Sequence, residues 1–184
     1  MAENIALERE DFWSNNPCDG DSFTHIVLPG VGSFDDFMFR LENSGFDMFL
    51  RRIHNDASAA ILGVCIGMHI MSDRSDDGEK KGLGLIPGEV LRIPGIVVTP
   101  HMGWNSIEQM SETSLLESVD LEKGFYYLHN YMFRCANNDD VIAIAGYNVE
   151  IESIVMKNRT IGVQFHPEKS HANGIKLFSN FLGM

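Results

Sequence analysis

Residues 58–73 read SAAILGVCIGMHIMSD, and this stretch decides the fold class of the chain. Its first half is a short apolar run typical of a buried strand, and a helical pattern begins at Ile66, directly after Cys65. Gly63 and Gly67 flank the cysteine at this turn. The arrangement is that of a Gly-x-Ser-x-Gly nucleophile elbow with sulfur in place of oxygen, a sharp turn that leaves the side chain strained but exposed. The stretch therefore predicts an α/β sheet that carries a thiol nucleophile.

The expected turn also affects the acidity of Cys65. The first turn of a helix points free N–H groups at the sulfur, and we expect them to favour the thiolate and lower the pKa of the thiol. The alternative is a buried cysteine that closes a core strand, although such a residue needs no flanking glycines. A thiolate nucleophile also needs a base, and the base needs an orienting group.

The stretch TIGVQFHPEKS at residues 160–170 offers both groups. Pro167 stops the strand and stiffens the turn, which would hold the carboxylate of Glu168 near the imidazole of His166 and fix its tautomer. A His-Pro-Glu tripeptide by itself is commonly a surface turn. Together with the elbow cysteine, it predicts a catalytic base and its orienter.

A second glycine-rich loop, LPGVGSF at residues 28–34, completes the set. Gly30 and Gly32 around Val31 would expose backbone N–H groups, as an oxyanion-binding strand must, and the N–H of Ile66 would supply another donor. A simple glycine turn is the alternative for this loop. With nucleophile, base, orienter and oxyanion donors, the sequence predicts acyl transfer through a thioester.

Length and charge narrow the class of protein. The 184 residues, 44% of them hydrophobic, suit one globular domain, which we place at residues 24–184 after an irregular segment at 1–23. A net charge of −12 argues against nucleic acid or an anionic membrane surface as a partner. No apolar run approaches the roughly 20 residues of a membrane span, and the acidic N-terminus does not resemble a signal peptide.

Cysteine usage points to a reducing compartment. The chain has three cysteines, an odd number, and they are widely spaced and form no CxxC motif: Cys18, Cys65 and Cys135. This pattern argues against a disulfide framework and a structural zinc site, and it suits the cytoplasm. We expect no metal and no cofactor.

The remaining hydrophobic pattern predicts strand–helix units followed by a run of strands. A strand begins at His25, helical spacing covers 35–53 with an interruption at Gly45, and a final amphipathic helix covers about 173–181. Further strands are expected at 90–93, 96–100, 125–133, 141–148, 152–158 and from 160 to Pro167. This order indicates an α/β sheet with an antiparallel extension.

Four motifs in register, PGVGSF, GVCIGM, PHMGWN and GVQFHPEKS, resemble the class I glutamine amidotransferases. PHMGWN and the PGVGSF variant are similar to the glutaminase subunits of imidazole glycerol phosphate synthases. The resemblance runs from about residue 24 to the C-terminus. It implies a doubly wound, mostly parallel, flavodoxin-like sheet and hydrolysis of glutamine to glutamate. It also implies a heterodimer in which ammonia passes through a (β/α)8-barrel partner for histidine biosynthesis.

The resemblance also implies roles for single residues. Cys65 would be the nucleophile, His166 the acid and base, and Glu168 the orienter. Gly67 and His69 would contact the bound glutamine. In the FYYLHNY stretch beside the glutamine pocket, His129 and Tyr131 are expected to be structural.

A further group would face the partner. Met102 and Trp104 would dock on the barrel, Asn105 would help to control activation, and Lys169 would lie near the ammonia exit. A large flat tryptophan suits an interface hot spot. A core tryptophan and a solvated surface lysine are the alternatives for Trp104 and Lys169.

The chain departs from the family pattern in two places. The family has glutamine four residues after the nucleophile, where this chain has His69. An imidazole cannot both donate and accept at one point while neutral, so we expect glutamine binding to be altered and pH-dependent near neutrality. Residues 1–23 also show neither the first strand and helix nor the second strand of the family, and losing an interior strand would expose two strand edges.

Three alternatives remain open. A paralogous subunit could supply ammonia for amidation of surface-polysaccharide sugars, and the histidine at position 69 favours that interpretation slightly. A truncated, non-catalytic docking subunit could bind the partner through Trp104. Such a subunit would not need Cys65, His166 or Glu168, and their presence speaks against this alternative. A cysteine peptidase of the related fold fits the PHMGWN and HPEKS stretches poorly.

Overall fold

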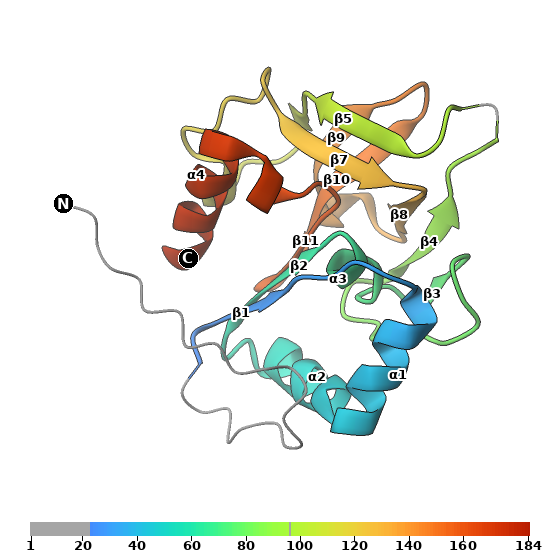
Figure 1. Cartoon of the computed structure of the whole chain (residues 1–184). Coiled ribbons are helices and arrows are strands. Elements are labelled where there is room, and N and C mark those ends of the chain that lie inside the picture. The colour runs from blue at the N-terminus through green and yellow to red at the C-terminus, as the bar shows by residue number, and fades with distance from the viewer. Residues whose placement is uncertain (1–22, 96) are drawn as a thin grey trace.

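A computed structural model describes residues 23–95 and 97–184 (Figure 1). Its main sheet has six strands in the order β1-β2-β11-β10-β9-β6. Their bounds are β1 His25–Leu28, β2 Ala60–Val64, β11 Thr160–Val163, β10 Glu150–Lys157, β9 Val141–Gly146 and β6 Glu108–Gln109. The predicted α/β architecture with an antiparallel extension is confirmed. Among the described strands of this sheet, however, parallel pairing joins β1 to β2 and β2 to β11, which is two of the five strand pairs rather than most of them.

The sheet is continuous from β1 to β6, so no gap separates the described strands. Within the described residues β1 pairs only with β2, so β1 is one edge of this sheet and β6 is the other. Two expectations concern residues 1–23: an irregular segment and the absence of the first strand–helix unit. Except for Phe23, these residues lie outside the described part of the chain.

Helices cover both faces of the sheet. α1 (Phe34–Ser44) and α2 (Phe46–Asp56) lie on one side and α4 (His171–Leu182) lies on the other (Figure 1). The predicted interruption between α1 and α2 falls at Gly45, whose φ of 74° only glycine adopts without strain. Alternate residues of a strand face opposite sides, so Leu62 belongs to one hydrophobic cluster and Ile61 to the other.

Two small sheets extend the molecule. β5 (His101–Asn105) pairs with β7 (Phe125–His129), and β8 (Tyr131–Cys135) pairs with β4 (Gly88–Arg92), which also pairs with β3 (Arg74–Ser75). The short helices are α3 Ile66–His69, η2 Ser114–Leu116, η3 Asn138–Asp140 and η4 Pro167–Lys169. Among the described residues, no helix is long and apolar enough to cross a membrane.

Three predicted elements differ from the structure. The expected single strand at 125–133 is two strands that break at Asn130 and enter different sheets, which the continuous apolar pattern could not indicate. The expected strand at 96–100 is absent over 97–100, because Pro100 has no N–H to donate, and pairing starts at His101. The helix after Cys65 ends at His69 after a single turn.

Asn173, on α4, anchors the loop that enters β7. Its Nδ2 donates to the carbonyl oxygens of Asp120 at 2.8 Å and Gly124 at 2.7 Å, and its Oδ1 accepts from the Asp120 N–H at 3.2 Å. Asn173 and Gly124 are buried, so their polar groups depend on these bonds rather than on water. One asparagine thus ties α4 to the strand that carries part of the site.

Candidate functional site

Cys65 occupies the turn between β2 and α3 in a backbone conformation that side chains rarely adopt, with φ 53° and ψ −106°. Its N–H donates to the Val163 carbonyl at 2.8 Å, which fixes the turn against β11. A Cβ at Gly63 would lie 2.4 Å from the Gly67 carbonyl oxygen, and a Cβ at Gly67 would lie 1.9 Å from that of Leu28. The two glycines are therefore required by close backbone packing around a strained, half-buried cysteine.

His166 and Glu168 form the predicted pair. His166 Nδ1 lies 2.8 Å from Glu168 Oε1, and an ionised carboxylate only accepts hydrogen bonds, so Nδ1 carries the hydrogen and Nε2 is left as the base. The backbone N–H of His166 donates to Tyr126 on β7, and its carbonyl accepts from Ser170 Oγ. His166 is buried while Glu168 is exposed, so the orienting carboxylate is partly screened by water.

A cavity of about 340 Å³ joins these elements. Its walls include Cys65 and His166, so both side chains border the space that a substrate would occupy. The other lining residues are Val31, Gly32, Ile66, His69, Asp77, Leu128, His129, Asn130, Tyr131, Glu168 and Lys169. A larger cavity of about 820 Å³ beside β6 and the β9–β10 turn contains none of the predicted site residues.

Two predicted residues, Gly30 and Gly67, are not among those that line the cavity. A Cβ at Gly30 would lie 2.1 Å from Cγ2 of Ile66, and Gly67 packs against β1. Val31 and Gly32 do reach the cavity beside Ile66, as expected for an oxyanion loop. Gly30 and Gly67 are thus close-packed positions, while Val31, Gly32 and Ile66 line the cavity. The oxyanion and substrate contacts expected of these residues stay predictions.

Burial raises the pKa of the Cys65 thiol to about 11, despite a hydrogen bond from the Ile66 N–H that lowers it, and the charge of Glu168 raises it further. The expected lowering of this pKa is wrong for the chain by itself. The physical reason is that α3 has only one turn, so its N–H groups do not offset the loss of water around the sulfur.

His69 is buried and engages Gln164, a residue that the sequence analysis missed. His69 Nε2 lies 2.9 Å from Gln164 Oε1, and Gln164 Nε2 donates to Cys65 Sγ at 3.9 Å. The only signal in the sequence was the place of Gln164 two residues before His166 at the end of a strand. Its contact with sulfur depends on the pairing of β11 with β2.

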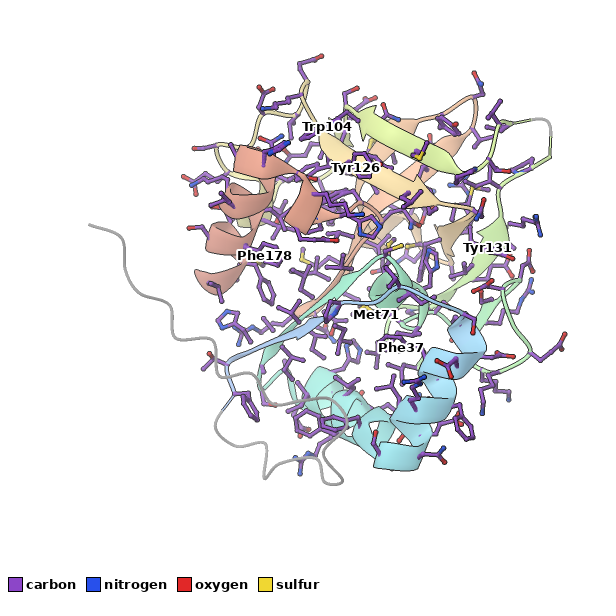
Figure 2. All side chains as sticks on the ribbon, viewed as in Figure 1. Phe37, Met71, Trp104, Tyr126, Tyr131 and Phe178 are labelled. Carbon is purple, nitrogen blue, oxygen red and sulfur yellow. The ribbon has the colours of Figure 1, made fainter. Side chains whose placement is uncertain are left out.

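The β5–β7 sheet presents an apolar face next to the cavity. Trp104 pairs with Tyr126 across the two strands (Figure 2). Met102 pairs with Leu128, and Met102, Trp104 and Leu128 are exposed large hydrophobic side chains. The Lys169 ammonium lies 5.7 Å from the centre of the Tyr126 ring. Because Leu128 also lines the cavity, this apolar face reaches the site.

Asn105, on the opposite face of β5, begins a buried hydrogen-bond chain. Its Nδ2 lies 3.3 Å from His101 Nε2, and His101 Nδ1 lies 2.9 Å from His129 Nε2. His129 Nδ1 donates to the Tyr131 carbonyl at 2.7 Å. Burial lowers the pKa of His101 to about 4 and that of His129 to about 3, so both rings are neutral at pH 7. The structural role predicted for His129 accords with this chain, and His101 was not anticipated.

Comparisons with known proteins agree with this geometry. Residues 11–183 match the family described as glutamine amidotransferase class-I. The chain is 40% identical over 163 residues to the imidazole glycerol phosphate synthase subunit HisH of Bdellovibrio bacteriovorus, covering 86% of this chain and 80% of that protein. Against the subunit of the same name from Leptospira interrogans, identity is 38% over 168 residues, 89% of this chain and 82% of that one.

A comparison with solved structures supports the fold. A crystal structure of a glutamine amidotransferase superposes with a TM-score of 0.65 at 19% identity, covering 87% of this chain and 78% of that one. An elbow cysteine beside a His–Glu pair, a matching sheet and these sequence relatives lead to one assignment. The chain belongs to the class I glutamine amidotransferases and, within them, to the family of imidazole glycerol phosphate synthase HisH subunits.

Proposed function

We propose that this glutamine amidotransferase hydrolyses glutamine at Cys65 and hands the ammonia to a (β/α)8-barrel synthase subunit, with which it forms a heterodimer in the cytoplasm. The observation that carries the proposal is the shared cavity, which is lined by both the strained elbow cysteine and the His166 imidazole that Glu168 orients. The family assignment supports the substrate and the place in histidine biosynthesis.

The reaction follows from the protonation states. His166 Nε2 takes the proton of the Cys65 thiol, and the sulfur attacks the carboxamide carbon of glutamine. The same proton then passes from Nε2 to the leaving nitrogen, so the C–N bond breaks, ammonia departs and a γ-glutamyl thioester remains. Water attacks the thioester with Nε2 as base, which releases glutamate and restores the thiol. Glu168 keeps Nδ1 protonated throughout and stabilises the imidazolium.

The oxyanion of each tetrahedral intermediate needs donors on the cavity wall. The N–H of Ile66 hydrogen-bonds the Cys65 sulfur. Val31 and Gly32 line the same cavity as Cys65 and Ile66. Gly32 has φ 134°, a conformation open to glycine, so this loop can turn its N–H groups without strain.

The raised pKa of the Cys65 thiol predicts slow turnover by the chain alone. We propose that the partner binds the apolar face of Met102, Trp104 and Leu128, which continues into the cavity, and that binding activates the site. Lys169 lines the cavity and its ammonium lies over the Tyr126 ring, a place that suits a residue at the exit of ammonia toward the partner.

The test is glutamate release by the purified chain, alone and with a matching barrel subunit and its nucleotide ligand. We expect activity that rises at least tenfold with partner and ligand and disappears in Cys65→Ala. No glutamate in any combination, with binding to the barrel retained, would instead support a docking subunit without catalysis.

A further inference from the structure

Gln164 lies between a buried histidine and the nucleophile. It directly follows β11, it is fully buried, and its backbone N–H donates to the Ser153 carbonyl at 2.9 Å, so its position is fixed. Its side chain reaches Cys65 Sγ at 3.9 Å with Nε2 and His69 Nε2 at 2.9 Å with Oε1. The amide therefore joins the imidazole to the sulfur.

The direction of these bonds depends on which ring nitrogen of His69 carries a hydrogen. The Gln164 amide oxygen lies against His69 Nε2, and an amide oxygen only accepts, so this arrangement puts the hydrogen on Nε2 and turns the amide N–H toward Cys65. The reversed amide would aim its oxygen at the sulfur, which favours the neutral thiol over the thiolate. A glutamine at position 69 could pair with either orientation, whereas this histidine tautomer permits one.

The residues around His69 fix its position and keep its ring neutral. Its backbone N–H donates to the Cys65 carbonyl at 3.0 Å, and only 4% of the residue is exposed. Asp77 lines the same cavity, but its carboxylate accepts from the Phe34 N–H at 3.0 Å and bonds the Tyr131 hydroxyl. Burial lowers the pKa of His69 more than the hydrogen bond to Gln164 and the charge of Asp77 raise it, so the ring is neutral at pH 7.

We propose that His69 is a positioning residue for the nucleophile: it orients Gln164 so that an amide N–H faces the Cys65 sulfur and stabilises the thiolate. This differs from the glutamine contact expected of position 69. The proposal rests on the proposed function only in taking Cys65 as the nucleophile, and its effect on the thiol can be measured without substrate.

The experiment measures alkylation of Cys65 by iodoacetamide in the full chain between pH 7 and 10, read by mass spectrometry of the Cys65 peptide. There the rate follows the thiolate fraction, so one unit of thiol pKa changes it about tenfold. We expect His69→Ala and Gln164→Leu each to slow alkylation roughly three- to tenfold. His54→Ala is the matched control, because His54 is also buried and bonds Thr160 Oγ1 at 2.8 Å.

Two further variants test the route through Gln164. If His69 acts through the amide, the double variant His69→Ala/Gln164→Leu will be no slower than Gln164→Leu. His69→Gln keeps a donor and most of the volume, so it should fold and show an intermediate rate, and it decides the case if His69→Ala does not fold. Alkylation of His69→Gln and the other folded His69 variants at the wild-type rate, or additive losses in the double variant, would overturn the proposal.

Glutaminase kinetics with the partner separate this proposal from the proposed function. Positioning of the thiolate predicts a lower kcat with little change in KM for His69→Gln. A raised KM with unchanged alkylation would assign His69 to glutamine binding and overturn the positioning role. If the wild-type complex has no glutaminase activity but the alkylation pattern holds, the proposed function fails while the positioning role of His69 stands.

Discussion

Replacing Gly67 with alanine tests the packing that forms the nucleophile elbow. The new Cβ would lie 1.9 Å from the Leu28 carbonyl oxygen and 3.0 Å from its carbon. Both atoms belong to the backbone of β1, so no rotamer change relieves the contact. Either α3 or β1 must move by roughly 1.5 Å before the atoms reach ordinary van der Waals separation.

The expected cost follows from these contacts. Overpacking of a well-filled site costs about 1–3 kcal/mol, and a contact with a paired strand belongs at the upper end. The higher helix propensity of alanine returns at most about 1 kcal/mol in the single turn of α3. We therefore expect Gly67→Ala to lower the free energy of unfolding by about 2 kcal/mol, or roughly 4–8 °C in Tm for a chain of this size.

Urea unfolding followed by circular dichroism measures this loss. Gly146→Ala, at the end of β9, is the control because a Cβ there meets nothing within 4 Å. The control should stay within about 0.5 kcal/mol of the wild type. A Gly67→Ala variant as stable as that control would refute the argument from the Leu28 contact.

Three more predictions follow from buried polar groups and the apolar face. His101 has a pKa of about 4 in the folded chain, so as the pH falls this histidine is protonated first in the unfolded state. The free energy of unfolding measured in urea should therefore fall by about 2 kcal/mol between pH 7.5 and pH 5 because of this residue, and His101→Asn should not show that fall. Asn173→Ala removes the partner of the Gly124 carbonyl and of the Asp120 N–H, while the Asp120 carbonyl keeps its bond from the Gly124 N–H; we expect a cost of about 2–4 kcal/mol by the same measurement, whereas a loss under about 1 kcal/mol would mean that water replaces the amide. Trp104→Ala should weaken barrel binding at least about thirtyfold in calorimetry while Tm changes little, and unchanged affinity would move the interface elsewhere.

The sequence indicated the chemistry because each motif is local. A glycine on either side of Cys65 has a steric reason within one turn, and Pro167 sets the distance from His166 to Glu168 over two residues. Such arrangements are short enough that residue order alone predicts which groups come together. The α/β architecture was likewise predictable from strand and helix periodicity.

Contacts across the sheet required the tertiary structure. Gln164 reaches Cys65 only because β11 pairs in parallel with β2, and His101 meets His129 only through the register of β5 with β7. The pKa of the Cys65 thiol likewise depends on how much water the folded chain excludes. The sequence by itself determined the elbow, the His–Glu pair and the fold class, because local sterics and periodicity specify them. Only the tertiary structure decided what His69 touches and how acidic the nucleophile is, because strand pairing and burial join residues that lie far apart in the chain.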